Sequence, residues 1–339
     1  MAEISMREAY GRALAEYGVA DPRVVALDAD TSASTLSTFF ARRFPERFFN
    51  IGIAEPCMVD VAAGLALGGF VPFVNGFASI LSLRALEQIR TCVCYARANV
   101  KIAASYAGIS DFKDGASHYS ITDLANVRAL PEMTVIVPAD AAEGAAWVPL
   151  VAACDGPVYL RISRAGTLPV YRPGTKLEIG KGLTLRDGKD LTLVAAGSMV
   201  GRCARAAQEL AARGVDARLL ELHTLKPLDR DLILKAAGET GALVTAEEHS
   251  LIGGLGSAVA ETLAEACPVP LERVGIRDRF CPTGRDLDKL MDMCGLSIAE
   301  LVAAAGRVLE RKTSKTFNRK GHDVVPEGQG TQSINSESL

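Results

Sequence analysis

Short apolar runs alternate with longer helical stretches through most of the 339 residues, and this alternation limits the chain to few folds. Runs that are apolar on both faces are typical of parallel strands covered by helices on each side of a sheet. Five such runs occupy the first half, at 24–27, 70–74, 100–104, 135–137 and 158–162. The helical stretches between them lie at 6–17, 56–67, 81–96 and 141–153, the last with Asp140 as a predicted N-cap. The pattern predicts an α/β fold of doubly wound domains.

A change in composition divides the chain into two such domains. Residues 171–189 are rich in glycine, proline and charge, which is typical of a connector. We therefore place the first domain at 1–170 and the second at 190–311, where the α/β pattern resumes and closes with a helix at 297–311. The polar residues 312–339 hold few apolar side chains and are predicted to form a disordered tail.

Charge and composition exclude several classes of protein. Lys and Arg number 37 against 40 Asp and Glu, a net charge of −3 that argues against nucleic-acid or anionic-membrane binding. The charged amino terminus lacks the apolar core of a signal peptide. Because the eight cysteines contain no CxxC pair, we expect no zinc site and reduced core cysteines in a cytoplasmic protein.

One apolar stretch is long enough to cross a membrane. Residues 61–83 carry no charged side chain, and about 20 apolar residues span a bilayer. Gly68, Pro72 and Gly76 would break such a helix where lipid offers the freed backbone groups no partner. We therefore predict a buried helix, a turn, a buried strand and the start of a second helix.

Glu55 has the most unusual surroundings of any acidic residue in the sequence. It is the only acidic residue between Arg47 and Asp60, and it stands at the start of a helix of small and apolar residues. Burial penalises the charged form of a carboxyl, so Glu55 either has a specific partner or a raised pKa. A purely structural carboxylate at a helix start is the alternative.

Two glycine-containing segments are further candidates for a site. The loop after the strand at 100–104 contains Asp114 and His118, and ligands bind beyond the carboxyl ends of parallel strands. A solvated loop that caps the next helix is the alternative. The segment 253–256, Gly-Gly-Leu-Gly, either cradles a phosphate at a helix start or allows close packing.

Together these segments resemble a known family over about residues 5–310. The stretches at 48–74 and 99–143 resemble the pyrimidine-binding domain of transketolases, and those at 191–229 and 242–261 resemble their C-terminal domain. The resemblance implies two doubly wound domains of these kinds. Two related groups share this half, the 1-deoxyxylulose-5-phosphate synthases and the beta subunits of 2-oxo acid dehydrogenases.

The resemblance implies thiamine diphosphate as cofactor. Glu55 matches the catalytic glutamate that binds a ring nitrogen of the aminopyrimidine and favours its imino form. Phe77 matches an aromatic residue that packs against this ring, and Asp30 matches an acid near the cofactor. Ile80 replaces a second aromatic residue and is expected to cover the ring by apolar contact.

Other matching positions imply contacts with a sugar phosphate. Arg7, Ser34 and Arg164 match residues that hold its terminal phosphate, a task suited to guanidinium groups and a hydroxyl. Asp114 and His118 match residues that contact the donor's hydroxyls, and His118 is also a candidate catalytic residue. A helix-face charge for Arg7, an N-cap for Ser34 and a connector charge for Arg164 are the alternatives.

Two departures from the family pattern flank the expected donor. Tyr106 stands where transketolases usually have a histidine, and Lys113 stands where they have an acid. We expect Tyr106 to contact substrate, and the donor to be a variant ketose phosphate or one of different charge.

The family's Gly-Asp-Gly motif, which binds the diphosphate and its Mg²⁺, does not occur in the 339 residues. We therefore predict no metal ligand here and a separate diphosphate-binding subunit, in an α2β2 assembly whose interface buries residues 61–83. The predicted function is the C-terminal subunit of a split transketolase, which transfers a two-carbon ketol unit from a ketose phosphate to an aldose or aldose phosphate. A beta subunit of a 2-oxo acid dehydrogenase, a 1-deoxyxylulose-5-phosphate-synthase-like enzyme and a noncatalytic paralogue are the alternatives.

Overall fold

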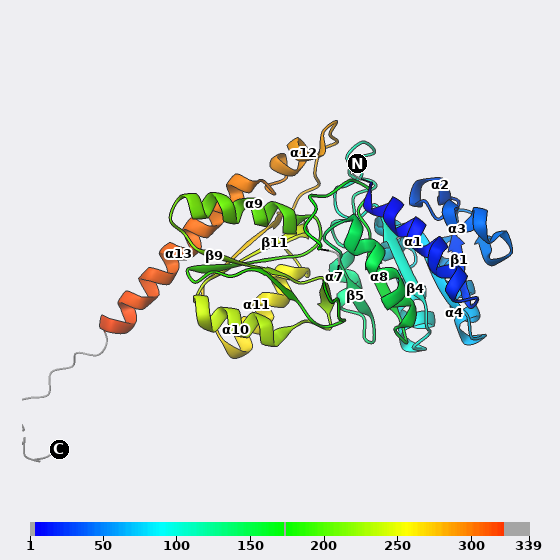
Figure 1. Ribbon diagram of the computed structural model, residues 1–339, viewed down its shortest axis with the longest axis horizontal. Helices are drawn as coiled ribbons and strands as arrows, with labels where there is room; N and C mark the ends of the chain where they lie inside the picture. The colour runs from blue at the N-terminus through cyan, green and yellow to red at the C-terminus, as the bar shows by residue number, and fades with distance from the viewer. Residues whose placement is uncertain (1–3, 173, 322–339) are drawn as a thin grey trace, which may run out of the picture.

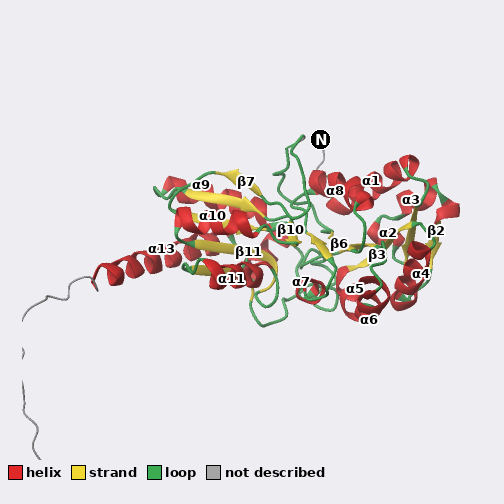
Figure 2. Cartoon of the chain, turned by 90° about the horizontal axis from the view of Figure 1, so that it is seen from below, coloured by secondary structure: helices red, strands yellow, loops and turns green. Residues whose placement is uncertain are grey.

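Two α/β domains lie side by side along the long axis of the computed structural model, which describes residues 4–172 and 174–321 (Figure 1). The final helix α13 (Ile298–Gly321) projects from the end opposite the first domain. Each domain has a mixed sheet with helices on both faces, as Figure 2 shows from a second side. The predicted α/β class with two doubly wound domains is confirmed.

The first sheet has seven strands in the order β10-β5-β6-β4-β3-β1-β2, and all neighbours are parallel except β10 and β5. Its central strands are buried because they are apolar on both faces. The strands are β1 (Val24–Asp28), β2 (Phe48–Asn50), β3 (Val71–Phe77), β4 (Lys101–Ser105), β5 (Thr134–Ile136), β6 (Val158–Arg161) and β10 (Thr224–Lys226).

Helices cover both faces of this sheet. Tyr10 and Trp147 are fully buried where α1 (Met6–Ala20) and α8 (Ala141–Ala153) pack on one face. Asp140 is the N-cap of α8, as predicted, and accepts the amide of Glu143. The other face is covered by α4 (Glu55–Leu67), α5 (Ala78–Arg84), α6 (Leu86–Gln88), the π-helix η2 (Ile89–Tyr95) and α7 (Asp123–Arg128). The short elements α2 (Ser32–Thr35), α3 (Thr38–Arg43) and η1 (Pro45–Arg47) join β1 to β2.

The second sheet has five strands in the order β12-β11-β8-β9-β7. Helices α9 (Met199–Ala212) and α13 pack on one face, and α10 (Arg230–Thr240) and α11 (Leu255–Ala266) on the other. The strands are β7 (Leu183–Arg186), β8 (Leu191–Ala195), β9 (Ala217–Glu221), β11 (Leu243–Ser250) and β12 (Leu271–Ile276), and the short α12 (Leu287–Met293) precedes α13.

The structure differs from the sequence-based expectations in three elements. Strand β7 lies inside the stretch expected to be a connector, because it pairs antiparallel with β9. The single helix expected at 81–96 is divided into α5, α6 and η2. Helix α13 continues to Gly321, so 312–321 are helical although a disordered tail was expected from residue 312; the rest of that tail lies outside the described residues.

One pair of cysteines is brought together by the fold. Cys281 follows β12 and Cys294 ends α12, and their Cα atoms are 6.0 Å apart, within the range of a disulfide. Their spacing of 13 residues in the sequence gave no indication, because the fold of the loop brings them together. The other six cysteines are free.

The uncharged stretch at 61–83 has the predicted order of elements, the second half of α4, a turn, β3 and most of α5. The strand is buried as predicted, but the helical part is not fully buried, because Val61, Leu67 and Leu83 are exposed. None of the helices in the described residues is both long enough and apolar enough to cross a bilayer.

Arg161, which forms a buried ion pair with Asp123, also links the two domains. Arg161, at the end of β6, donates to Asp123 at 2.8 Å and to the backbone oxygens of Ser120 and Glu248. Burial alone would raise the pKa of Asp123, but the adjacent Arg161 guanidinium outweighs burial and lowers that pKa. Since Glu248 belongs to β11, one guanidinium holds the first sheet, the loop before α7 and the second sheet together.

Replacing Asp123 by Ala is expected to lower the free energy of unfolding by about 3–5 kcal/mol, because Arg161 stays buried without its counter-ion. Urea unfolding measures the change. As a matched control, Glu265→Ala removes the exposed partner of Arg230 and is expected to cost less than about 1 kcal/mol. Equal losses in the two variants would contradict this view of the junction.

Candidate active site

An aromatic cluster lies at the carboxyl edge of the first sheet. Phe77 ends β3, Tyr106 follows β4, and their ring centroids are 4.3 Å apart. The His118 ring stands edge-on to Phe77 at 5.9 Å. Tyr106 accepts a hydrogen bond from Arg7 of α1 at 2.8 Å. Four of the predicted site residues are thus brought together from three separate segments, α1, the end of β3 and the loop after β4.

Two guanidinium groups flank the Tyr106 ring. The Cζ of Arg7 lies 5.4 Å from its centroid and the Cζ of Arg164, which follows β6, lies 5.2 Å away. Arg7 also donates to the backbone oxygen of Ser34 at 2.6 Å, so Ser34 contributes its carbonyl to Arg7. Ser34 lies within α2 and is not its N-cap. The buried Nε of Arg7 has no partner among the described residues, which marks a place for a polar ligand or a water.

Asp111 belongs to this cluster, although sequence reasoning did not single it out. Its Oδ1 accepts from Arg164 Nη1 at 2.7 Å, and the side chain is fully buried. Burial, together with the nearby carboxylate of Asp114, raises the pKa of Asp111 to about 6. Asp114 and Lys113 are exposed on the same loop. In the sequence, Asp111 was marked only by its place three residues before the candidate Asp114.

The second domain holds this loop in place. The carboxylate of Glu248, on β11, accepts the amide of Ile109 at 2.7 Å. Gly108 has a φ of +62°, and a Cβ there would lie 2.3 Å from Glu248 Oε1, so only glycine fits. Further along, Gly284 N donates to Phe112 O at 2.8 Å. The loop that carries Tyr106, Asp111, Asp114 and His118 therefore depends on contacts from the C-terminal half.

Glu55 forms a separate group with Arg84. It is the first residue of α4, its side chain is 5% exposed, and its Oε2 lies 2.8 Å from Arg84 Nη1 at the end of α5. Arg84 itself is 52% exposed, and sequence reasoning missed it. Ile80 is half-buried on α5. Within 4–172 and 174–321, no hydrogen bond, ion pair or ring contact links Glu55 to the aromatic cluster.

Asp30 stands apart from both groups. It is exposed after β1, has a φ of +62° and exchanges hydrogen bonds with Asn50 at 3.0 and 3.1 Å. This pairing fixes the turn between β1 and α2, and no contact with the other predicted site residues is recorded among the described residues.

The glycine-rich segment at 253–256 does not bind phosphate, because the chain's own Glu247 occupies the position. The Glu247 carboxylate accepts the amides of Leu255 at 2.7 Å and Gly256 at 2.8 Å, at the start of α11. A Cβ on Gly254 would lie 2.0 Å from Glu247 Oε2. The alternative of close packing is the correct one.

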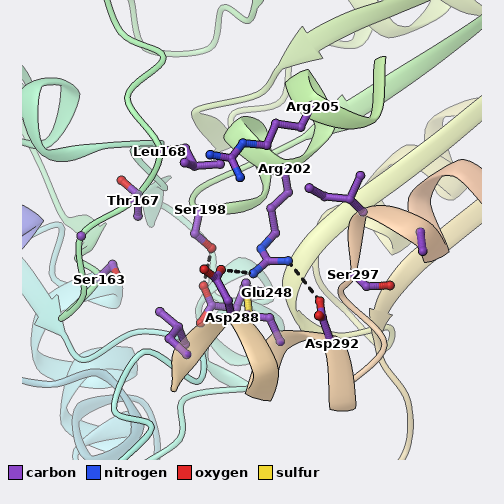
Figure 3. A pocket seen from close by; sticks show the side chains of 15 residues that line it. Ser163, Thr167, Leu168, Ser198, Arg202, Arg205, Glu248, Asp288, Asp292 and Ser297 are labelled. Atoms are coloured by element: carbon purple, nitrogen blue, oxygen red, sulfur yellow. Dashed lines mark hydrogen bonds and ion pairs between the residues drawn. The ribbon is translucent and has the colours of Figure 1, made fainter. Parts of the chain in front are cut away.

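A cavity of about 460 Å³ lies at the domain junction, and none of the predicted site residues lines it (Figure 3). Ser198 donates to Glu248 there, and Arg202 is paired with Asp288 and Asp292 of α12. Glu248 therefore separates this cavity from the loop at 106–120.

Comparison with known proteins assigns the chain to a family. The sequence profile of the transketolase pyrimidine-binding domain matches residues 2–168, and that of the transketolase C-terminal domain matches residues 180–301. The chain therefore belongs to the transketolase family, which confirms the resemblance found in the sequence.

Similar proteins of nearly the same length are single subunits. A 6-deoxy-6-sulfo-D-fructose transketolase subunit of Clostridium sp. (strain MSTE9) is 44% identical over 91% of this chain and 95% of that protein. One of the apulose-4-phosphate transketolase subunits of Phocaeicola vulgatus is 39% identical over 81% of this chain and 88% of that protein.

A solved structure, described as a split-gene transketolase in an inactive beta4 tetramer, is 48% identical with a TM-score of 0.84. It matches 92% of this chain and 100% of that one. Transketolase from Leishmania mexicana, 22% identical with a TM-score of 0.76, shares the fold over 91% of this chain and 46% of its own.

The aminopyrimidine end of thiamine diphosphate fits the residues present. A buried carboxylate and apolar side chains on α5 suit an aminopyrimidine ring, which needs a hydrogen-bonding partner and a dry surface. In the part of the chain that the structure describes, no cluster of three His, Cys, Asp or Glu side chains could hold a metal ion.

Replacing Glu248 by Ala is expected to speed amide exchange at 107–121 by about 10- to 100-fold, because the Ile109 amide loses a bond to a charged group. Hydrogen-exchange mass spectrometry measures the change against peptides from β1. Glu261→Ala removes an exposed partner of Arg128 and serves as the matched control. Unchanged exchange at 107–121 would refute the dependence of the loop on Glu248.

Proposed function

We propose that the chain is the C-terminal subunit of a two-subunit transketolase, which transfers a two-carbon ketol unit from a ketose phosphate to an aldose or aldose phosphate. The supporting observation is that relatives named as transketolase subunits match over nearly their whole length. The longer 1-deoxy-D-xylulose-5-phosphate synthases match over only 48% of theirs, and they remain the alternative. We further propose a cytoplasmic enzyme of carbohydrate metabolism with a first domain at 1–170 and a second domain that includes β7 and all of α13, at 183–321.

The partner in this proposal is a diphosphate-binding subunit that brings the Mg²⁺ ligands, in an α2β2 assembly. The similar beta4 tetramer is described as inactive, which agrees with a beta chain that needs another subunit. Exposed apolar side chains support an interface on α4 and on α5 and η2, which both pack against α4. They are Ile53, just before α4 (77% exposed), Val61, Leu67, Leu83 and Tyr95 (88% exposed).

At this interface Glu55 would act on the cofactor. Bound thiamine diphosphate supplies the carbon nucleophile that this chemistry requires. Glu55 holds a proton at the ring nitrogen of the aminopyrimidine, while Phe77 and Ile80 exclude water from the ring and Asp30 lies near it. Arg84 binds Oε2 of Glu55, so the ring nitrogen would meet the other carboxylate oxygen or displace Arg84.

The aromatic cluster would receive the sugar. Arg7 and Arg164 bind the terminal phosphate through their unpartnered N–H groups, with Ser34 fixing Arg7 from behind. His118 and Asp114 bind the donor's hydroxyls, and His118 moves a proton at the hydroxyl of the transferred unit. Tyr106 closes this part of the site by its contacts with Phe77 and both arginines.

Reconstitution tests the proposal. The chain is purified alone and with a candidate diphosphate-binding subunit from the same organism, and ketol transfer is assayed with Mg²⁺ and thiamine diphosphate. We expect turnover only from the mixture, because the chain alone offers one end of the cofactor site. Full activity of the chain alone, or none from a folded complex, would contradict the proposal. Decarboxylation of a 2-oxo acid would favour the alternatives instead.

Glu55→Gln in the assembled enzyme is expected to lower kcat by about 100- to 10,000-fold, the usual contribution of general acid–base catalysis. Glutamine keeps the shape and a hydrogen bond but cannot exchange a proton. The control is Glu209→Gln on the exposed face of α9, which should leave kcat unchanged. If Glu55→Gln turns over normally, the chain is a noncatalytic paralogue or the proton is held elsewhere.

A further inference from the structure

Asp111 is a buried carboxylate that the roles proposed above leave unused. It is fully buried in the loop after β4, and its recorded charged partner is Arg164, at 2.7 Å. Burying a carboxylate costs free energy unless it is paired and hydrogen-bonded. The buried carboxylate of Asp111 is therefore favourable only while the Arg164 guanidinium stays beside it.

Arg164 is held on several sides but keeps free donors. Its guanidinium lies 5.2 Å from the Tyr106 centroid and 6.0 Å from that of Phe112. Asp111 takes one N–H of Nη1, whereas Nε and Nη2 have no recorded partner among the described residues. The side chain is 22% exposed, so these groups can reach a ligand at the carboxyl edge of the sheet.

We propose that Asp111 is a positioning residue for the anionic end of the donor sugar. Its carboxylate holds the Arg164 guanidinium against Tyr106, so that the free N–H groups of Arg164 meet a phosphate or sulfonate in one orientation. The proposal rests on the proposed function for the identity of the donor, but the binding step can be tested on this chain without turnover.

Positioning and simple charge neutralisation predict opposite results. If Asp111 only reduced the positive charge of Arg164, its removal would strengthen binding of an anion. If it positions Arg164, its removal weakens binding, because the ligand must then immobilise a free guanidinium itself. The direction of the change in affinity therefore decides between the two.

The dependence on pH gives a second, independent readout. With its pKa at about 6, Asp111 is ionised above that pH and holds Arg164, and it releases Arg164 as the pH falls below it. The other groups that face it are Asp114, His118 and Tyr119. Protonation of Asp114 or His118 would strengthen anion binding, and burial raises the pKa of Tyr119 to about 12, beyond this range. Weaker binding at low pH therefore points to Asp111.

The first test measures ligand binding to the full chain by NMR titration. Fructose 6-phosphate and 6-deoxy-6-sulfofructose are the probes, because a phosphate ester itself titrates near pH 6 whereas a sulfonate stays ionised. Asp111→Asn is expected to weaken the binding of both ligands about 10-fold at pH 7.5. Asp111→Glu should recover part of the loss, and Asp187→Asn, an exposed acid of the second domain, should change nothing.

The pH series uses the sulfonate. Wild-type affinity should fall between about pH 7 and pH 5, and Asp111→Asn should be weak throughout. Asp114→Asn removes a neighbouring negative charge, so the fall should move to lower pH even if Asp111→Asn were to fold poorly. Tighter or unchanged binding in Asp111→Asn, a flat wild-type profile, or no wild-type binding of either probe would overturn the proposal.

Kinetics of the assembled enzyme distinguish a failure of this proposal from a failure of the proposed function. With glycolaldehyde as acceptor, Asp111→Asn should raise KM for fructose 6-phosphate about 10-fold. KM and kcat for hydroxypyruvate, a donor of the same two-carbon unit without a phosphate, should stay as in the wild type. An equal rise in both KM values would show a merely structural role. An inactive wild-type assembly would count against the proposed function and leave the binding result to stand alone.

Discussion

The buried ion pair between Arg161 and Asp123 is the contact on which the rest of the structure depends. The Arg161 guanidinium binds a carboxylate from α7, the Ser120 carbonyl at the end of the candidate-site loop, and the Glu248 carbonyl of the second sheet. The side chain of Glu248 then accepts the amide of Ile109 near the start of the same loop. Both ends of the loop are therefore fixed at one junction, and the C-terminal domain, which has no predicted site residue of its own, shapes the site of the first.

The candidate site consists of two parts with different demands. The aromatic cluster around Tyr106 carries two guanidinium groups, of which Arg164 is paired with Asp111 within this chain. The Glu55–Arg84 pair lies at an exposed face, where apolar side chains of α4 and η2 are accessible and Arg84 is half-exposed. The buried Glu55 carboxylate has the half-exposed Arg84 as its counter-ion, an arrangement that suits a surface covered by another molecule. Among the described residues the two parts share no hydrogen bond, ion pair or ring contact, and no cluster of three His, Cys, Asp or Glu side chains could hold a metal ion.

Hydrophobic periodicity was enough to predict the fold class and most central strands, because strands such as β1 and β4 are apolar on both faces and cannot lie elsewhere. The candidate Glu55 was also visible, since one acid in an apolar helix start is a local signal. Strand β10, the Cys281–Cys294 pair and the role of Glu247 were not predictable, because each depends on which distant segments meet. Asp111 and Glu248 were missed for the same reason, because their neighbours in the sequence give no signal. Their importance comes from contacts in the folded chain: Asp111 accepts from Arg164, and Glu248 accepts from the amide of Ile109.

The proposed function requires that this chain hold one end of a cofactor site and that another subunit complete it. Calorimetric titration of thiamine diphosphate with Mg²⁺ into this chain, into the diphosphate-binding subunit and into their mixture tests this requirement. We expect saturable, tight binding only in the mixture, and its loss from that mixture in an assembly-deficient variant such as Tyr95→Asp, which places a charge on the exposed face of η2. Binding of full affinity to this chain alone would contradict it.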